Sequence, residues 1–355
     1  MRINPGLHVL ELSSSARQFG LGPEALVLRG LRDSDLAFLS ALHAGLPDGA
    51  EAAAARSHSV PAPRARALTQ ALSPILLPFP DAAGSAEPAV PALRLERLAV
   101  DSDRLSASYR VNGSAIVRRR SRAAVEINGL GRIGSLLART LAGAGVGTLV
   151  LADPGAVLPS DIGPGYPLTD QGMLRAQAVK RHIYRLDPTI QVLTARGAAP
   201  GQRPAHPDLA VWVGTPPGAG RPAGPASEQP HLGVTVQETG VDVGPLVVPG
   251  LTPCLECLDR HLADGNSTWY SAADALRRQQ VEAAPAGEET AGAVLAAGAA
   301  AGQVLAFLDA VVQPSTWSAV LVLRSADGYP GLKKLTFHPD CGCRLQQRSS
   351  PAQAS

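Results

Sequence analysis

The stretch Ala124-Val-Glu-Ile-Asn-Gly-Leu-Gly-Arg-Ile-Gly134 decides the fold of this chain. An apolar, strand-like run enters a glycine-rich turn, and residues 135–144 continue with the pattern of a helix. A second buried strand is predicted at 147–153. The order of strand, glycine turn, helix and strand predicts a βαβ unit of the nucleotide-binding type.

The glycines of this turn have separate predicted tasks. A GxGxxG pattern alone is a weak signal, but its place between a strand and a helix strengthens it. Gly129 permits the tight turn, Gly131 lets the backbone approach a phosphate, and Gly134 allows close packing of the helix. Asp153 ends the second strand and is placed to accept hydrogen bonds from ribose hydroxyls. We expect a nucleotide-type fold, whereas occupancy by a nucleotide stays an open question.

Further strands and helices alternate downstream of this unit. Residues 172–186 have the pattern of a helix that stops at Asp187-Pro188, and residues 208–214 read as another strand. Such alternation predicts an α/β protein with a parallel, doubly wound, Rossmann-like sheet.

The N-terminal residues predict a small α+β module. Three short strand-like runs are separated by Gly and Pro, and a helix that Asp33 or Ser34 can cap follows them. The runs are His8–Leu12, Ala16–Gly20 and Ala25–Arg29.

A stretch rich in Ala, Gly and Pro marks the expected boundary between domains. The chain of 355 residues is long enough for two or three domains. We predict a module at 1–80, a linker at 81–95, a larger domain at 96–346 and a flexible tail at 347–355.

All four cysteines fall in two short motifs, Cys254-Leu-Glu-Cys257 and Cys341-Gly-Cys343. Two pairs of thiolates match the tetrahedral geometry of a structural zinc. A closed site of four sulfurs has no open position for a metal-bound water and leaves no cysteine as nucleophile or thioester carrier. The alternatives are two disulfides or reduced core thiols, but the start of the chain shows no export signal.

Composition excludes several classes of function. A net charge of +2 and an aromatic content of 4% supply neither a positive field nor a stacking surface for nucleic acid. Without an export signal the cytoplasm is the expected compartment. Residues 291–308 carry no charge, but they are rich in Ala and Gly, so we expect a packed helix and no membrane span.

The glycine turn, the run Gly145-Val-Gly-Thr-Leu-Val-Leu-Ala-Asp-Pro154, Gly172 before Arg175, Asp187-Pro188 and the paired cysteines together resemble the ThiF-type, ubiquitin-activating-like adenylyltransferases. The resemblance covers about 125–343. It implies a fold that binds Mg-ATP and adenylates the C-terminus of a peptide or small protein. The cofactor-binding positions it implies are Gly129, Gly131, Arg132, Gly134, Asp153 and Arg175.

Several positions depart from the pattern of the active enzymes. Arg132 stands where a second adjacent glycine is usual, Asp161 where an asparagine is usual, and Arg175 where a lysine is usual. No carboxylate follows the strand at 208–214 before Glu228, although active members carry an Asp there. These departures predict a degenerate ATP site.

The segment 243–261, Trp269, the Ala-rich helix and 337–343 closely resemble the ThiF-like partner proteins of azole-forming peptide cyclodehydratases. In that family a winged-helix-like N-terminal element binds the leader of a ribosomal precursor peptide, and a separate YcaO-type protein performs the chemistry. The resemblance implies a scaffold, a homodimer, and a leader-binding groove formed by 25–29 and the helix at 36–42.

Two other readings stay open at this stage. The first is an active adenylating enzyme in which Arg132, Arg175 and Arg181 replace the missing cation contacts. The second is a zinc-stabilised interaction protein outside peptide modification. His261 and His338 flank the cysteines and are expected beside the metal or on the surface, and the basic run 118–122 is expected on a solvated face or against an acidic leader.

Overall fold

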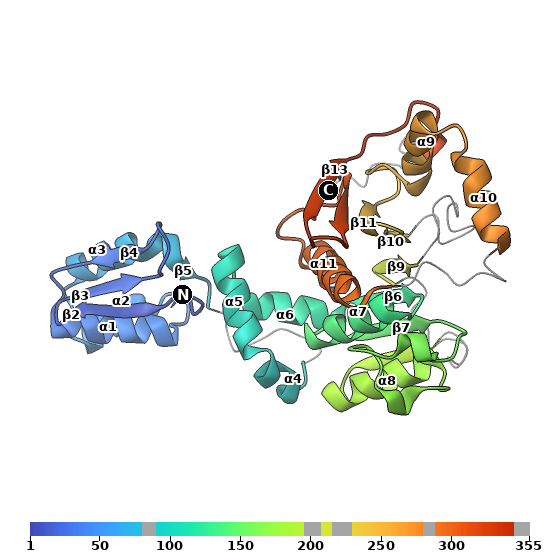
Figure 1. Cartoon of the computed structure of the whole chain (residues 1–355). Helices are drawn as coiled ribbons and strands as arrows, with labels where there is room; N and C mark the ends of the chain where they lie inside the picture. The colour runs from blue at the N-terminus through green and yellow to red at the C-terminus, as the bar shows by residue number, and fades with distance from the viewer. Residues whose placement is uncertain (80–89, 195–206, 215–228, 280–287, 344–355) are drawn as a thin grey trace. The chain divides into compact units, whose positions relative to one another are not determined.

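The computed structural model describes residues 1–79, 90–194, 207–214, 229–279 and 288–343. Contacts divide the chain into two compact units, Met1–Arg118 and Arg119–Ser355, each of which is described by itself (Figure 1). The limits given above for module, linker and tail stay a prediction. Residues 81–89 of the linker and the tail lie outside the described residues, and helix α4 begins at Ala92, inside the range given to the linker.

The first unit contains a three-stranded antiparallel sheet in the order β2-β3-β4, which confirms the three predicted strands. Its middle strand pairs Gln18 with Leu10 on one side and with Val27 on the other. The strands are β1 (Arg2–Ile3), β2 (Val9–Ser13), β3 (Ala16–Phe19), β4 (Leu26–Leu28) and β5 (Leu76–Leu77), and β1 pairs with β5. The helices are α1 (Asp33–Ala44), α2 (Glu51–Ser57), α3 (Ala62–Leu72), α4 (Ala92–Arg97), α5 (Ala99–Tyr109) and α6 (Gly113–Arg122), which crosses the boundary between the units.

Helix α1 shows how sequence and packing agree in this unit. The Asp35 carboxylate accepts the N–H of Arg32 at 3.0 Å and so satisfies a backbone donor at the helix start. Phe38, Leu39 and Leu42 then recur at helical spacing, and all three are buried in the core of the unit.

The second unit is built on an eight-stranded sheet in the order β13-β12-β11-β10-β9-β6-β7-β8. The strands from β10 to β8 run parallel, and β11, β12 and β13 extend them as antiparallel neighbours. The strands are β6 (Ala124–Asn128), β7 (Thr148–Ala152), β8 (Gln191–Thr194), β9 (Leu209–Val213), β10 (His231–Gln237), β11 (Gly240–Val247), β12 (Ala319–Arg324) and β13 (Pro330–Lys334). The helices are α7 (Arg132–Gly143), α8 (Arg175–Leu186), α9 (Leu255–Gly265), α10 (Trp269–Gln279) and α11 (Thr290–Asp309).

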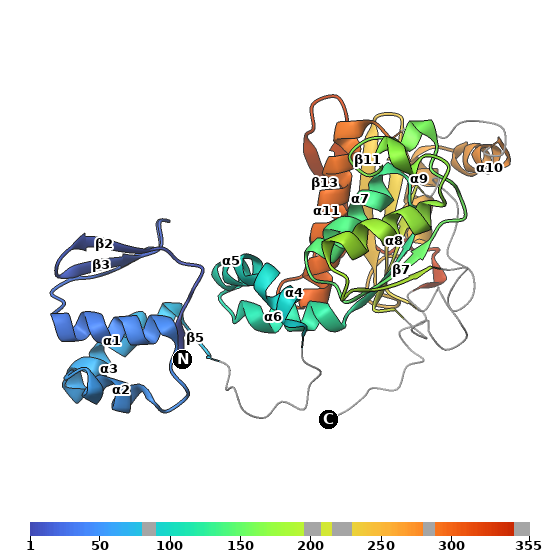
Figure 2. The same cartoon turned by 90° about the horizontal axis from the view of Figure 1, so that it is seen from below.

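The predicted α/β fold with a Rossmann-like sheet is confirmed, and the sheet is mostly parallel, while its doubly wound character is not confirmed. Helices α7, α8 and α11 pack against the sheet, and α7 contacts both of the others, so the three form one layer (Figure 2). The connections between β8, β9 and β10 do not bear on this prediction. These include 195–206 and 215–228, which lie outside the described residues. The antiparallel extension was not predicted. β10 with β11 and β12 with β13 are hairpins between strands that follow each other in sequence, whereas the pairing of β11 with β12 joins residues far apart.

Helix α11 is long and apolar enough to cross a membrane by length and composition alone. Its alanines at 293, 296, 297, 300 and 301 are buried in the core against α7 and the sheet. The helix therefore packs as expected for a small-residue core helix.

The basic run 118–122 is not simply a solvated face. Arg120 is buried, and its Nε and Nη2 lie 2.7 and 2.6 Å from the two carboxylate oxygens of Asp309, at the end of α11. Arg120 therefore belongs to the interior of the second unit. Removing either partner would leave the other charge buried without compensation, which is costly.

Candidate functional site

The candidate site lies where the parallel strands end. Strand β6 leads into the turn at Gly129 and β7 leads into Asp153. The chain leaves β6 toward β7, whereas β9 pairs on the opposite side of β6, so the strand order reverses here. Such a switch point is where open α/β sheets bind ligands.

Two of the three turn glycines are required by the backbone alone. Gly129 has a φ of +89°, and a Cβ on it would lie 2.4 Å from the Val213 carbonyl oxygen. A Cβ on Gly134 would lie 2.0 Å from the carbonyl oxygen of Gly129. At Gly131 the nearest atom is instead a carboxylate oxygen of Glu288, at 3.0 Å. The three atoms nearest to that position all belong to the Glu288 side chain, so Gly131 faces this side chain.

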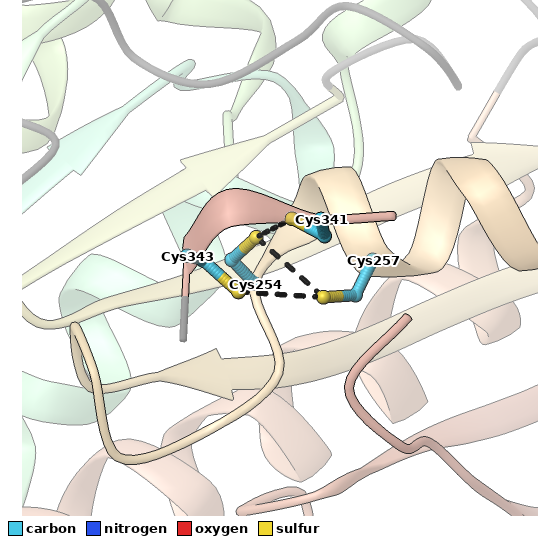
Figure 3. A group of neighbouring side chains, drawn as sticks. All are labelled: Cys254, Cys257, Cys341 and Cys343. Atoms are coloured by element: carbon cyan, nitrogen blue, oxygen red, sulfur yellow. Dashed lines mark hydrogen bonds between the residues drawn. The ribbon is translucent and has the colours of Figure 1, made fainter. Parts of the chain in front are cut away.

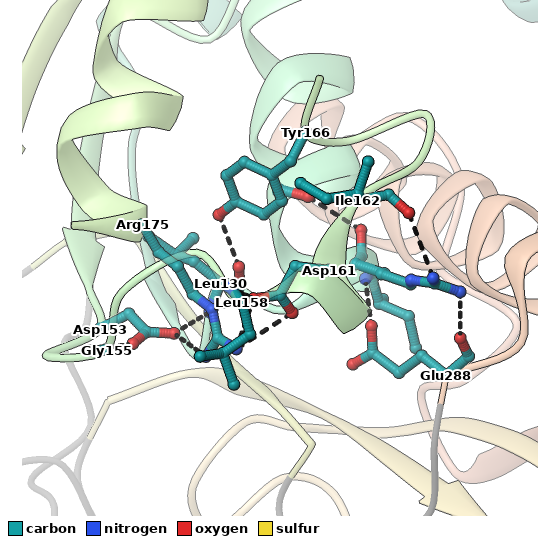
Figure 4. Close-up of polar contacts among 12 residues, drawn as sticks. Leu130, Asp153, Gly155, Leu158, Asp161, Ile162, Tyr166, Arg175 and Glu288 are labelled. Atoms are coloured by element: carbon teal, nitrogen blue, oxygen red, sulfur yellow. Dashed lines mark hydrogen bonds and ion pairs between the residues drawn. The ribbon is translucent and has the colours of Figure 1, made fainter. Parts of the chain in front are cut away.

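Asp153, the residue expected to face a ribose, holds the glycine turn. Its Oδ2 accepts the N–H of Leu130 at 2.7 Å, and its Oδ1 accepts the N–H of Gly155 at 2.7 Å (Figure 4). Arg175 Nη1 lies 3.5 Å from Oδ2. Both carboxylate oxygens are thus engaged within the chain.

Arg175 begins α8 and pairs with Asp161. Its Nε and Nη2 lie 2.9 and 2.8 Å from Oδ2 of Asp161, and Nη2 lies 3.0 Å from Oδ1. Burial opposes the charge on Arg175, but the hydrogen bonds and charge of Asp161, with the charge of Asp153, outweigh it and raise the pKa of Arg175. The cation expected to meet a phosphate is therefore neutralised by neighbouring carboxylates.

Arg132 and Glu288 close the other side of the turn. Nη1 of Arg132 donates to the Glu288 carbonyl at 3.0 Å and to Thr290 Oγ1 at 3.1 Å, and Nη2 donates to the Ile162 carbonyl at 3.2 Å. Oε2 of Glu288 accepts the N–H of Ile133, in the first turn of α7, at 2.7 Å. Burial raises the pKa of Glu288, against the lowering effect of the Ile133 N–H and of Arg175 and Arg132.

Tyr166 forms a hydrogen bond with the backbone of the glycine turn. Its side chain is fully buried, and its hydroxyl donates to the carbonyl oxygen of Leu130 at 2.6 Å. Burial raises the pKa of Tyr166 well above its ordinary value, so the phenol stays protonated and remains a donor.

As they lie in this structure, these residues do not fit the phosphates of ATP. The start of α7 holds a carboxylate where an anion would bind, and Arg175 is paired with Asp161. The six predicted cofactor positions are brought to one edge of the sheet. There Asp153 and Arg175 contact each other, and Asp153, Arg132 and Arg175 also bond to other groups of the chain. Glu288 and Tyr166 were missed by sequence reasoning. Nothing at position 288 signals its contact with Ile133, since the two lie 155 residues apart.

The four predicted cysteines come together in a buried cluster (Figure 3). Sulfur–sulfur distances are 3.9 Å for Cys254 and Cys257, 3.7 Å for Cys254 and Cys341, and 3.5 Å for Cys257 and Cys343. A bond of about 2.3 Å from zinc to each sulfur implies about 3.8 Å between two tetrahedral sulfurs. A disulfide needs about 2.05 Å, which excludes the two-disulfide alternative. The cluster could bind a metal with all four sulfurs.

A second group of possible metal ligands lies near the cysteines and consists of His261, Asp264 and His338. Nδ1 of His338 accepts the N–H of Asp340 at 3.1 Å, which leaves the ring proton on Nε2, 3.0 Å from Asp264. Nε2 of His261 lies 3.0 Å from the Thr336 carbonyl and must donate to it. Because both Nε2 atoms act as donors, these histidines fit a structural role beside the cysteines.

Comparisons with known proteins agree with this geometry. Residues 105–206 match the model of the ThiF family. Crystal structures of E. coli MccB with AMPCPP and MccA, and of MccB with N-formylated MccA, match at 17% identity with TM-scores of 0.63 and 0.65. They cover 97% of this chain and 98% and 99% of MccB. PaaA matches at 17% identity with a TM-score of 0.64, over 93% of this chain and 98% of PaaA.

No curated protein sequence matches the chain. At 17% identity the likeness to solved structures concerns the fold, and it extends over both units. The family match shows that the chain carries a ThiF family domain. The structural match shows that its fold is similar to that of MccB over nearly the whole length of both proteins.

Proposed function

We propose that this chain binds the leader segment of a ribosomally made precursor peptide through its first unit and presents it to a separate YcaO-type modifying enzyme. The first unit is then a winged-helix-like recognition module, and the ThiF family domain is a scaffold. By tethering the peptide, the protein raises the local concentration of the segment to be modified and performs no chemistry itself.

The free edge of β4 carries this proposal. β4 is the last strand of its sheet among the described residues, and it pairs only with β3 there. Leu26 and Leu28 pack against the core of the unit, whereas Val27 is 37% exposed. An extended peptide can pair with such an edge through its main chain, while pockets for alternate side chains give selectivity.

The groove expected from the sequence needs one revision. Phe38, Leu39 and Leu42 of α1 are buried in the core, so these residues have no apolar surface left for a peptide. Leu36 of α1 is only half-buried, so recognition would rest on the β4 backbone, on the side chains that flank it and on Leu36.

The likeness to MccB supports peptide binding. It covers 97% of this chain, including the first unit, and MccB has been solved with N-formylated MccA, by its name a polypeptide with a formyl group at its N-terminus. The scaffold role is supported by Arg175 and Asp153, which bond within the chain, and by Arg132, whose two Nη atoms donate to groups of the chain.

An active adenylyltransferase is the second candidate. MccB has also been solved with ATP, and this chain keeps the glycine turn between β6 and α7. The two functions separate in an exchange assay of the full-length protein with Mg-ATP, labelled pyrophosphate and a peptide carboxylate. Exchange above background would favour the enzyme, and its absence in a protein shown to be folded would favour the scaffold.

Three further features belong to the proposal. Zinc is the metal that Cys254, Cys257, Cys341 and Cys343 would hold, with the purely structural effect of joining α9 to the chain after β13. A homodimer is the expected assembly, and the cytoplasm is the expected compartment.

A selection for peptide ligands tests the function directly. A display library of random 20-residue peptides is selected against the immobilised full-length protein, and enriched peptides are assayed by calorimetry and amide exchange. The proposal expects enriched peptides that slow exchange at residues 26–28 of β4. Failure to enrich any peptide, or protection confined to the second unit, would contradict it.

A further inference from the structure

The start of α7 has the properties of an anion site. The first N–H groups of a helix have no intrahelical acceptor and carry the positive end of the helix dipole. The three atoms nearest to a Cβ placed on Gly131, just before α7, all belong to the Glu288 carboxylate, so a side chain occupies this place. Gly129 and Gly134 are explained by close backbone contacts, whereas the place beside Gly131 is filled by a side chain, so a ligand can approach there when that side chain leaves.

The carboxylate of Glu288 lies in this space. Its Oε2 accepts the Ile133 N–H at 2.7 Å, and its oxygens lie 3.0 and 3.3 Å from the Cβ position of Gly131. The Arg132 side chain also holds this segment. Its Nη1 donates to the backbone carbonyl of Glu288 at 3.0 Å and to the hydroxyl of Thr290 at 3.1 Å. Figure 4 shows the Glu288 side chain directed toward this turn.

Within the part of the chain that the structure describes, no arginine or lysine forms an ion pair with this carboxylate. Arg132 is directed at carbonyl oxygens and at Thr290, and Arg175 pairs with Asp161. Burial and the charge of Asp161 disfavour the ionised form of Glu288. The contact is thus specific in geometry and modest in strength, which is the condition under which another anion can replace it.

We propose that Glu288 is a built-in occupant of the anion cradle formed by Gly131, Arg132 and Ile133, and that a phosphate-bearing ligand binds there only when Glu288 leaves. The contact would be autoinhibitory, and its release would move the start of α11, which Thr290 begins. This inference goes beyond the proposed function, because it holds for a scaffold and for an adenylating enzyme alike.

Calorimetric titration with inorganic pyrophosphate and with Mg-ATP tests it on the full-length protein. Glu288→Ala removes the carboxylate, and Glu289→Gln is the charge-matched control, since Glu289 is exposed and caps α11 through Ala291 and Gly292. We expect Glu288→Ala to bind pyrophosphate about tenfold more tightly than the unmodified protein, because the Ile133 N–H, a donor at the positive end of the helix dipole, becomes free. Glu289→Gln should match the unmodified protein within about twofold.

Equal affinity of Glu288→Ala and the unmodified protein would overturn the proposal, and so would the absence of binding to both. If Glu288→Ala does not fold, Glu288→Gln and the unmodified protein keep the test decisive. In the unmodified protein, millimolar pyrophosphate should then speed amide exchange at 288–292 as the carboxylate is displaced. Binding of pyrophosphate with exchange at 288–292 unchanged would equally overturn it.

Discussion

Arg175 and Asp161 form a bidentate ion pair in which Nε and Nη2 of the arginine both lie within 3.0 Å of the carboxylate. The two positions look like separate departures from the ThiF pattern in the sequence. In the structure they are one feature, because the acid at 161 and the cation at 175 neutralise each other. Such a pair stabilises the loop between β7 and α8 and lowers the attraction of the site for phosphate.

Replacing Arg175 should cost stability. Arg175→Ala leaves Asp161 and Asp153 close together without their shared cation, and both side chains are mostly buried. We expect a loss of about 2 kcal/mol in the free energy of unfolding, at the low end for a broken buried pair because Arg175 is partly exposed. Urea denaturation of the single variants and of Arg175→Ala with Asp161→Asn measures the coupling. A coupling energy near zero would show that the pair does not stabilise the fold.

Removing the proposed zinc should unfold the region around α9. One zinc per chain is expected by elemental analysis, and Cys257→Ser should lose it and lower the melting temperature, because three sulfurs no longer close the site. His261→Ala is the control and should keep its zinc, since His261 bonds to the Thr336 carbonyl. A second zinc that disappears in His261→Ala would instead identify the histidine group as a metal site.

Asp35 should make the first unit sensitive to acid. Burial alone would raise the pKa of Asp35, but hydrogen bonds from Arg64 and from the Arg32 N–H outweigh it and lower the pKa below its ordinary value of 3.8. A lowered pKa means that this stabilisation is present above the unfolded-state pKa and is lost as pH falls through the folded-state pKa. Asp35→Asn should therefore cost about 1 to 2 kcal/mol at neutral pH and progressively less below about pH 4.

Denaturation curves at several pH values measure that difference. Asp33→Asn is the matched control, because Asp33 is exposed in the same helical turn. A stability deficit of Asp35→Asn that does not shrink in acid would argue against the ionised carboxylate as its source.

The edge of β4 should be the peptide-binding edge. Val27→Glu places a charge beside an incoming strand, and we expect peptides selected against the protein to bind about threefold to fivefold more weakly, the scale of one cross-strand pair. Val9→Glu makes the same change on β2, at the other edge of the sheet, where Val9 is 43% exposed. Calorimetry measures the peptide affinity of both variants. An equal loss of affinity in the two would contradict the assignment of peptide binding to the edge of β4.

Local patterns predicted much of this fold. The strand, glycine turn and helix around Gly129 were readable because neighbouring residues alone set the turn conformation and the apolar periodicity. The three strands of the first unit and helix α11 were predicted for the same reason. The cysteine cluster was predicted from the spacing of its two pairs, since each pair is fixed by a single turn of chain.

Contacts between distant segments could not be read in this way. The pairing of β11 with β12, the ion pair of Arg120 with Asp309, and the hydrogen bond of Glu288 with Ile133 each join segments whose approach depends on packing of the whole unit. Buried polar groups take whatever partner the packing supplies, because leaving them unpaired is costly.

The sequence by itself therefore determined that this is an α/β protein with a nucleotide-type glycine turn and four clustered cysteines. Only the tertiary structure decided what that turn holds. The same residues would serve a phosphate if Arg175 and the first amides of α7 were free, but Asp161 and Glu288 reach them from elsewhere in the chain. The physical reason is that a short motif sets the direction of its donors, whereas the acceptor that meets them is chosen by packing in three dimensions.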